Sequence, residues 1–415
     1  MKGITYIAKR SRTLVGPNDI IAIANLAKKD KKAGNKIINA SIGSFLDENG
    51  KLGDVPVIDD ALKENITADL SYGPSSGDPS FREAVIDWIF TDRRPKLESL
   101  YSVFSGASIG GTGALFNAFS LFLEEGDSVL LPDILWTNYT LLARKAGLKS
   151  QFYSLFDKDR KFNILSVKEN IEALAKKQNH VFFLLNDPCQ NPTGYCLSEE
   201  EYDALFSMLE EEGKKTDLIV LFDIAYLDYY NVNGHHCALV DKLLEKKADF
   251  LPLISFSCSK LFGLYGLRVG ALLALAPNPT EKDEIQAAYG SQARGTYSVP
   301  VCSAEVAVCK AMEDKGSREK LLSEVEANKL LLSKRSKEVV LLLKEYGFDF
   351  YPYSSGFFIT LVIKNAFPVF EAMKKQHMYV VPLDENHIRL AVSGLSLADA
   401  KVLIPALKKA AEENK

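Results

Sequence analysis

The sequence has no long hydrophobic run and little net charge. Its 415 residues contain no stretch near the roughly 18 consecutive apolar residues that predict a membrane-spanning helix. The 50 basic and 54 acidic side chains leave a formal net charge of −4, which gives no electrostatic attraction to nucleic acid or to an anionic membrane. The N-terminus carries positive charges but no continuous apolar core, so we do not expect a secretory signal.

Cysteine and histidine are also scarce, which limits disulfide and metal chemistry. The six cysteines include no Cys-x-x-Cys pair, and their distribution does not suggest a disulfide framework. We therefore expect six reduced thiols in a cytoplasmic protein. The adjacent His235 and His236 have no cysteine or carboxylate partner at ligand spacing, so we predict no metal site. The cysteines are Cys189, Cys196, Cys237, Cys258, Cys302 and Cys309.

The middle of the chain has the pattern of an α/β fold. Short apolar segments alternate there with helical stretches, which predicts a mostly parallel sheet covered on both faces. The glycine-rich stretch 105–113 is expected to be a loop. Strands are expected at 128–131, 181–185, 218–222, 250–257 and 268–275, and helices at 114–125 and after Trp136.

The two ends of the chain have a different organisation. The N-terminal part predicts helices at 17–34 and 55–70, a short strand at 37–42, and a turn over 72–77 that Ser80 could follow as a helix N-cap. Two long charged helices, 304–315 and 318–347, then lead into a smaller α/β unit. In that unit we expect strands at 356–363, 379–381 and 388–391, and helices at 368–375 and from 397 onward.

Lys260 is the main candidate for chemistry. It lies between the strands 250–257 and 268–275, whose connection is too short for a helical crossover, so the two strands should be antiparallel. A lysine held close to Arg268 in a partly desolvated site has a lowered pKa, which makes its amine a nucleophile. A solvated loop lysine is the common alternative, and the neighbouring residues decide between the two.

Those neighbours form a set of cofactor-binding candidates. Asp223 ends a buried strand, where its carboxylate must be paired or functional, and it can hold a pyridinium proton. Tyr226 and Asn191 offer hydrogen bonds to a phenolate-type oxygen, and Trp136 offers a flat face for ring stacking. Each also has a structural explanation: Asp223 as a helix N-cap, Tyr226 and Trp136 as core, and Asn191 as a turn former.

A phosphate site completes the set. Gly110-Gly111-Thr112-Gly113 opens a helix, so its backbone N–H groups and the Thr112 hydroxyl can cradle a phosphate. Ser257 and Arg268 are placed to close on the same phosphate from the other side. No P-loop Lys-Ser/Thr follows the glycines, which argues against a nucleoside triphosphate. Together these residues describe a pocket for pyridoxal phosphate.

The sequence resembles the aspartate and aromatic aminotransferase branch of the fold-type-I pyridoxal-phosphate enzymes, over nearly the whole chain. The matching motifs are 257–270 around Lys260, Asn191-Pro-Thr-Gly194, Asp223-Ile-Ala-Tyr226 and Gly110-Gly-Thr-Gly113. The resemblance implies a large domain with a mostly parallel, mixed seven-stranded sheet, and a smaller α/β domain. It places the large domain at 46–315, the small domain at 316–415, and residues 1–45 against the small domain.

The resemblance also assigns roles to the candidate residues. Lys260 is implied as the Schiff-base lysine, with Asp223 and Tyr226 as the other catalytic residues. Asp223 would pair with the ring nitrogen. The phosphate is assigned to Gly111, Thr112, Ser257 and Arg268, the ring oxygen to Tyr226 and Asn191, and the stacking contact to Trp136.

Three further residues are implied by the same resemblance. Tyr72 resembles the tyrosine that reaches the cofactor phosphate of the neighbouring subunit. Arg389, with Gly43 opposite, resembles the arginine that binds the substrate α-carboxylate. Arg294 resembles the arginine that recognises a second carboxylate across the interface of a homodimer with shared active sites.

The expected reaction moves an amino group between an L-amino acid, aspartate or aromatic, and a 2-oxo acid such as 2-oxoglutarate. Tyr139 and Asn186 stand where the aspartate enzymes have histidines supporting the ring-nitrogen aspartate, and Gln190 and Leu267 also depart from their pattern. Aspartate is therefore not fixed as the substrate. The alternative is a pyridoxal-phosphate lyase of the C–S or β-eliminating kind, which has less use for Arg294. A transcriptional regulator would need a DNA-binding module, for which residues 1–40 are too short.

Overall fold

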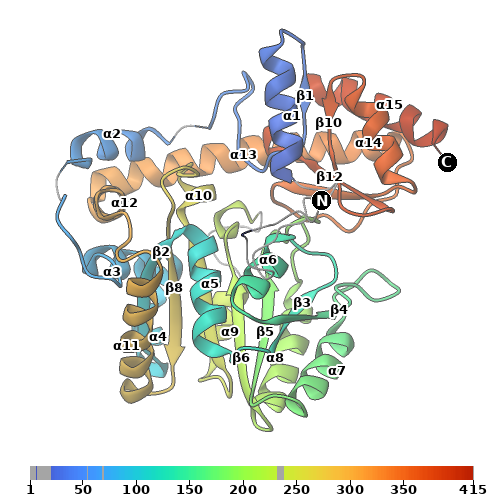
Figure 1. The fold of residues 1–415 in the computed structure, drawn as a ribbon. Helices are drawn as coiled ribbons and strands as arrows, with labels where there is room; N and C mark the ends of the chain where they lie inside the picture. Colours follow the sequence, from blue (N-terminus) through green and yellow to red (C-terminus); the bar gives the residue numbers. More distant parts are fainter. Residues whose placement is uncertain (1–5, 7–19, 54, 68–69, 231–237, 415) are drawn as a thin grey trace.

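The computed structural model describes residue 6 and residues 20–53, 55–67, 70–230 and 238–414. Its larger unit is built around a seven-stranded sheet of order β2-β8-β7-β6-β5-β3-β4 (Figure 1). These strands are β2 (Ser102–Ile109), β3 (Ser128–Pro132), β4 (Lys149–Tyr153), β5 (His180–Asn186), β6 (Asp217–Asp223), β7 (Leu251–Ser257) and β8 (Val269–Ala276). Strand β8 runs antiparallel to both of its neighbours, whereas the other pairs are parallel. The predicted mixed sheet is confirmed.

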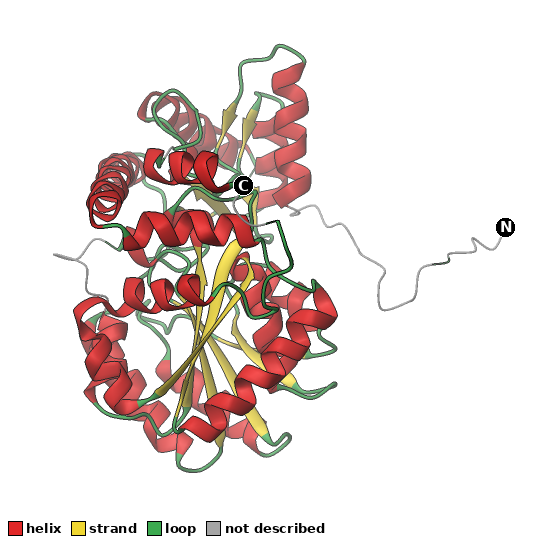
Figure 2. Cartoon of the chain, turned by 90° about the vertical axis from the view of Figure 1, so that its left-hand side faces the viewer, coloured by secondary structure: helices red, strands yellow, loops and turns green. Residues whose placement is uncertain are grey.

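Helices cover both faces of this sheet (Figure 2). Alternation along a strand sends side chains to opposite faces. On β5, for example, Phe182 and Leu184 enter the core under α5 (Gly110–Phe122) and α11 (Pro279–Thr296). Phe183 and Leu185 enter the core on the other face, with α3 (Pro79–Phe90) and α8 (Glu199–Gly213). The helices are α2 (Pro56–Asn65), α3 (Pro79–Phe90), α4 (Arg94–Leu100), α5 (Gly110–Phe122), α6 (Asn138–Lys145), α7 (Ile164–Ala175), α8 (Glu199–Gly213), α9 (Ala238–Glu245), α10 (Cys258–Leu261), α11 (Pro279–Thr296) and α12 (Cys302–Glu313).

The smaller unit has a three-stranded antiparallel sheet of order β11-β12-β9. The N-terminal strand β1 reaches this unit, because Ile38 pairs in parallel with Met378 of β10. The elements are α1 (Ile20–Lys32), β1 (Ile38–Asn39), β9 (Phe358–Val362), α14 (Ala366–Lys374), β10 (Met378–Tyr379), β11 (Val381–Pro382), β12 (His387–Ala391) and α15 (Leu397–Glu413). Short 3₁₀ turns lie at Thr91–Arg93, Leu227–Tyr229 and Val392–Gly394.

One long helix, α13 (Lys315–Glu345, 31 residues), joins the two units (Figure 1). Near its start, Leu321 and Val325 are buried in the core of the large unit. Farther along, Leu332 and Val339 are buried in the core of the small unit. A single rigid element therefore has side chains in both cores. Among the described residues, no helix is long and apolar enough to cross a bilayer.

Three local predictions were wrong. The expected loop 105–113 is instead the end of β2 and the first turn of α5. The small residues there serve close packing, since a Cβ added at Gly106 would lie 2.5 Å from Cε1 of Tyr289. Ser80 is not the N-cap of α3, because the carboxylate of Asp78 accepts the Phe81 N–H. The helix predicted at 55–70 ends at residue 65.

The packing at Gly270, the second residue of β8, leads to a testable prediction. A Cβ there would lie 2.6 Å from the carbonyl carbon of Gly110 and 2.6 Å from the carbonyl oxygen of Phe256, both of which are backbone atoms. We expect Gly270→Ala to lower the free energy of unfolding by about 1–3 kcal/mol, measured in urea at fixed protein and cofactor concentration. Gly290→Ala in α11 is the control, because its Cβ would meet nothing within 4 Å. Equal stability of the two variants would contradict this packing argument.

Candidate active site

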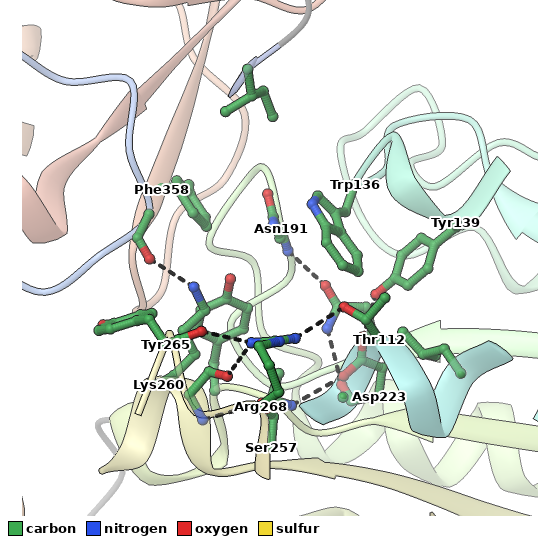
Figure 3. A pocket seen from close by; sticks show the side chains of 18 of the residues that line it. Thr112, Trp136, Tyr139, Asn191, Asp223, Ser257, Lys260, Tyr265, Arg268 and Phe358 are labelled. Atoms are coloured by element: carbon green, nitrogen blue, oxygen red, sulfur yellow. Dashed lines mark hydrogen bonds between the residues drawn. The ribbon is translucent and has the colours of Figure 1, made fainter. Parts of the chain in front are cut away.

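A pocket of about 220 Å³ lies at the carboxyl ends of the parallel strands, where ligands bind in open α/β sheets (Figure 3). It brings together most of the residues singled out by the sequence. Those that line it are Gly43, Gly111, Thr112, Trp136, Asn191, Asp223, Tyr226, Ser257, Lys260, Arg268 and Arg389. Tyr139 and Asn186, the departures noted above, line it as well.

Lys260 lies in the one-turn helix α10, directly after β7, and is partly enclosed by aromatic rings. Its Nζ donates a hydrogen bond to the carbonyl oxygen of Gly43 at 2.7 Å. Burial, reinforced by the positive charges of Arg389 and Arg268, lowers the pKa of Lys260 to about 7, although Asp223 opposes this shift. Near neutral pH, a large fraction of the amine is therefore unprotonated and nucleophilic.

Asp223 ends β6 and is buried. The Tyr139 hydroxyl donates to its Oδ2 at 2.5 Å, and the backbone N–H of Ala225 donates to its Oδ1 at 3.2 Å. Burial raises the pKa of Asp223 to about 6, and the Tyr139 hydrogen bond is the largest influence in the opposite direction. The carboxylate thus interacts with the charge of Lys260 but forms no ion pair with it, so its oxygens remain available to a ligand.

Asn186 links the ends of two neighbouring strands. Its Nδ2 donates to the carbonyl oxygen of Asp223 at 2.9 Å, and its Oδ1 accepts the backbone N–H of Asn191 at 2.8 Å. Both hydrogen bonds are buried. This side chain therefore fixes the position of Asn191 relative to Asp223.

An anion-binding cradle lies at the N-terminus of α5. A guanidinium nitrogen of Arg268 lies 3.5 Å from Oγ1 of Thr112, and another donates to Oγ of Ser259 at 3.0 Å. A Cβ added at Gly110, whose φ is +64°, would lie 2.6 Å from Nη2 of Arg268, so a side chain there would displace the guanidinium. Backbone N–H groups at a helix N-terminus, two hydroxyls and a guanidinium form a set of donors suited to a phosphate. The residues present therefore fit the phosphate group of pyridoxal phosphate.

Arg389 lies on β12 of the small unit and is 2% exposed. Its Nη2 donates to the carbonyl oxygen of Ser41 at 2.8 Å, and its guanidinium lies 4.3 Å from the ring centroid of Phe358 on β9. Burial lowers the pKa of Arg389 to about 10. Its buried Nε finds no acceptor among the residues that the structure describes. A buried cation with a free donor is suited to binding a carboxylate.

Gly43 forms the wall beside Arg389. A Cβ added at Gly43 would lie 2.4 Å from Cζ of Phe358. A larger residue at position 43 would therefore clash with the Phe358 ring, while the carbonyl oxygen of Gly43 accepts the hydrogen bond from Lys260.

Two of the predicted residues lie outside the pocket. Tyr72 is 88% exposed in the turn before α3, and Arg294 is exposed in the last turn of α11. Within this single chain, neither one meets the pocket.

Other residues of the pocket were missed by sequence reasoning. Tyr265 lies in the same connection as Lys260, and its ring centroid is 4.9 Å from the Lys260 Nζ. Its hydroxyl also accepts the backbone N–H of Phe45 at 2.8 Å. Because the connection between β7 and β8 is short, the sequence could have predicted that Tyr265 lies close to Lys260. Ile20 and Phe358 come from the small unit, and nothing in the local sequence marks them.

The sequence profile of the family "Aminotransferase class I and II" matches residues 35–407 of this chain. The chain belongs to this family. Among relatives of this aminotransferase, the aromatic-amino-acid aminotransferase of Paracoccus denitrificans is 30% identical over 68% of the chain and 70% of the relative. The tyrosine aminotransferase of Rhizobium meliloti is 25% identical over 92% of the chain and 94% of the relative.

Solved structures agree with this fold. An aminotransferase from Anaerococcus prevotii has a TM-score of 0.89 and 27% identity, covering 99% of this chain and 100% of that one. The aromatic-amino-acid aminotransferase of Burkholderia pseudomallei, solved covalently bound to pyridoxal phosphate, has a TM-score of 0.78 and 21% identity, covering 97% and 100% of the two chains. At 21% identity, the similarity to the Burkholderia pseudomallei structure is evidence for the fold alone.

Family membership confirms the predicted fold class, the predicted amino-group transfer between an amino acid and a 2-oxo acid, and the pyridoxal-phosphate cofactor. It does not support the lyase alternative.

The described residues do not include His235, His236 or Cys237. Within the described part of the chain, no group of three or more side chains is arranged to hold a metal ion.

Proposed function

We propose that this aminotransferase binds pyridoxal phosphate through Lys260 and acts on aspartate or an aromatic amino acid, with a 2-oxo acid such as 2-oxoglutarate as acceptor. The observation that carries the proposal is the pocket that brings the Lys260 amine together with Asp223 and Arg389, and burial there lowers the pKa of Lys260 to about 7. When bound, the cofactor supplies an electron sink and a carrier for the amino group.

The large sheet would hold the cofactor. Asp223 would keep the ring nitrogen protonated, while Tyr226 and Asn191 would bind the ring oxygen. Trp136 would cover one face of the ring, because it lies just before α6 and its side chain lines the pocket. The phosphate would be bound by Gly111, Thr112, Ser257 and Arg268.

The small unit would hold the substrate. Arg389 would bind the α-carboxylate through its unpartnered Nε and a terminal nitrogen, with the wall at Gly43 beside it. The amine of Lys260 would then take up and return the proton at the substrate Cα. The low pKa of Lys260 suits this role, because an amine near its pKa both accepts and releases a proton at neutral pH.

The active enzyme is proposed to be a cytoplasmic homodimer. Leu70 and Tyr72, 79% and 88% exposed, are large apolar side chains that a second copy would cover. In the dimer, Tyr72 would reach the cofactor phosphate of the other subunit, and Arg294 would reach its substrate. The described cysteines form no disulfide, which supports a reducing compartment.

A single-turnover screen tests the substrate proposal. Each standard amino acid is added to the cofactor-loaded enzyme, and the loss of the cofactor's visible absorbance is followed in time. Aspartate or the aromatic amino acids should react fastest. Faster reaction of an amino acid outside these two classes would reject the proposed donors but leave the family assignment intact.

Arg294→Leu is expected to separate dicarboxylic from aromatic substrates. If Arg294 binds a distal carboxylate, the KM values for aspartate and 2-oxoglutarate should rise by roughly ten- to a hundred-fold, the effect of losing a charge-assisted hydrogen bond. The KM values for tyrosine and phenylalanine should change little. Steady-state kinetics with both classes of donor measure the difference.

Arg144→Leu, at an exposed arginine in the last turn of α6, is the matched control. Sedimentation at assay concentration reports the oligomeric state of each protein. Equal effects of Arg294→Leu on both substrate classes, or a monomer with full activity, would refute the shared-site arrangement.

A further inference from the structure

We propose that Tyr139 is a positioning residue for Asp223: its hydroxyl holds the carboxylate ionised and directed at the cofactor ring nitrogen. This inference rests on the proposed role of Asp223. It goes beyond that role because it assigns the support of the carboxylate to a phenol that does not change its charge at the pH of catalysis.

The geometry of α6 sets the position of the hydroxyl. Tyr139 is 1% exposed, and its Oη lies 2.5 Å from Oδ2 of Asp223. Its ring packs edge-on against Trp136, with ring centroids 5.4 Å apart, and its backbone N–H donates to the Trp136 carbonyl oxygen at 3.0 Å. The turn leading into α6 and the first turn of α6 therefore orient the proposed stacking ring of Trp136 and the hydrogen bond to Asp223 together (Figure 3).

Several charged and titratable groups face this pair. Asp223 is faced by Lys260 from α10, by Tyr226 beyond the end of β6 and by Tyr139 from α6, and Tyr139 is itself faced by Tyr153 from β4. Lys260 and Tyr139 favour the ionised carboxylate, whereas burial disfavours it. Loss of the Tyr139 hydroxyl removes the strongest favourable contact.

Tyr139 remains a hydrogen-bond donor over the whole working range of pH. Burial, and next the negative charge of Asp223, raise the pKa of Tyr139 well above its usual value. A histidine in the same place would gain or lose a charge near neutral pH, and its effect on Asp223 would vary accordingly. The phenol therefore gives Asp223 a support that is independent of pH.

The consequence is a shift in the pH dependence of cofactor affinity. Binding of the protonated ring nitrogen needs the ionised carboxylate, so affinity falls as the pH drops through the pKa of Asp223. Tyr139→Phe removes the donor that lowers this pKa. The acidic fall should therefore begin at a higher pH, by about one unit or more, which corresponds to roughly a ten- to a hundred-fold weaker stabilisation of the carboxylate.

The test compares the parent holoenzyme with Tyr139→Phe and with the control Tyr153→Phe. Tyr153 is equally buried, but its hydroxyl contacts the Leu184 carbonyl oxygen at 3.5 Å and makes no hydrogen bond with Asp223. Equilibrium dialysis gives the dissociation constant of pyridoxal phosphate at each pH. The acidic fall should move in Tyr139→Phe alone, and kcat should drop about ten- to a hundred-fold with the KM for the amino acid nearly unchanged. A Tyr139→Phe profile that matches the parent or the control overturns the inference.

Two further variants keep the test decisive. If Tyr139→Phe does not fold, Tyr139→His is measured instead: an imidazole that titrates beside Asp223 should change the acidic fall, and a profile that matches the parent refutes the inference. Asp223→Asn is measured alongside. If it keeps the parent profile, the role of Asp223 itself is wrong. If it loses that profile while Tyr139→Phe retains it, the inference about Tyr139 alone is wrong.

Discussion

Replacing Lys260 with alanine is expected to abolish transamination while leaving the cofactor pocket in place. In the proposed function, Lys260 is both the nucleophile that attaches the cofactor and the amine that moves the proton, and the substitution removes both. General acid–base catalysis alone contributes roughly 10²–10⁴-fold, so turnover should fall by at least about four orders of magnitude. Pyridoxal phosphate should still bind, because the phosphate cradle and Asp223 remain. Single-turnover kinetics at saturating substrate measure the loss.

Chemical trapping identifies the attached lysine directly. Borohydride reduction of the parent holoenzyme should give a cofactor adduct that maps to Lys260, and attachment should speed up as the pH rises through about 7, where the amine loses its proton. A small added amine should partly restore the activity of Lys260→Ala, because the vacated space lies open to the pocket. Lys96→Ala, at an exposed lysine in α4, is the control. An adduct on a different lysine would refute the assignment.

Asp223→Asn is expected to cause the second largest loss, by at least about a thousand-fold in kcat. The amide has nearly the same shape and retains a partner in the Tyr139 hydroxyl, so the fold should persist. It carries no negative charge, however, and cannot stabilise a protonated ring nitrogen. Steady-state kinetics and urea unfolding together separate the catalytic loss from any loss of stability.

The chain provides a matched control for this substitution five residues later. Asp228 is half-buried, its pKa is likewise raised to about 6 by desolvation, and it accepts a hydrogen bond from Nε1 of Trp88 at 3.2 Å. Asp228→Asn should therefore cost stability but spare kcat. Near-normal turnover in Asp223→Asn would show that Asp223 is structural.

The sequence was sufficient to predict those parts of the fold that depend only on neighbouring residues, such as the length of a connection between two strands. The ten residues between Ser257 and Arg268 exclude a crossover helix, and β7 and β8 do form an antiparallel pair. Residues at strand ends, such as Asp223, were predictable for the same reason: the period of a buried strand and its end are visible in the sequence.

The remaining features depend on contacts between distant segments. Gly106 looks like part of a loop until Tyr289, far along the chain, is seen packed against it. Ile20 and Phe358 enter the pocket because the small unit packs over the large sheet. The burial that lowers the pKa of Lys260 to about 7 arises from this packing as well, and its size cannot be predicted from neighbouring residues.

The division of the site between two sheets has a consequence for inhibition and for evolution. Asp223 and Ser257 end strands of the seven-stranded sheet, whereas Arg389 and Phe358 lie on adjacent strands of the three-stranded one. If Arg389 binds the substrate as proposed, a compound that contacts the small sheet alone would compete with the amino acid without displacing the cofactor. For the same reason, substitutions in β9 and β12 can change the range of substrates during evolution while each successive variant still binds the cofactor.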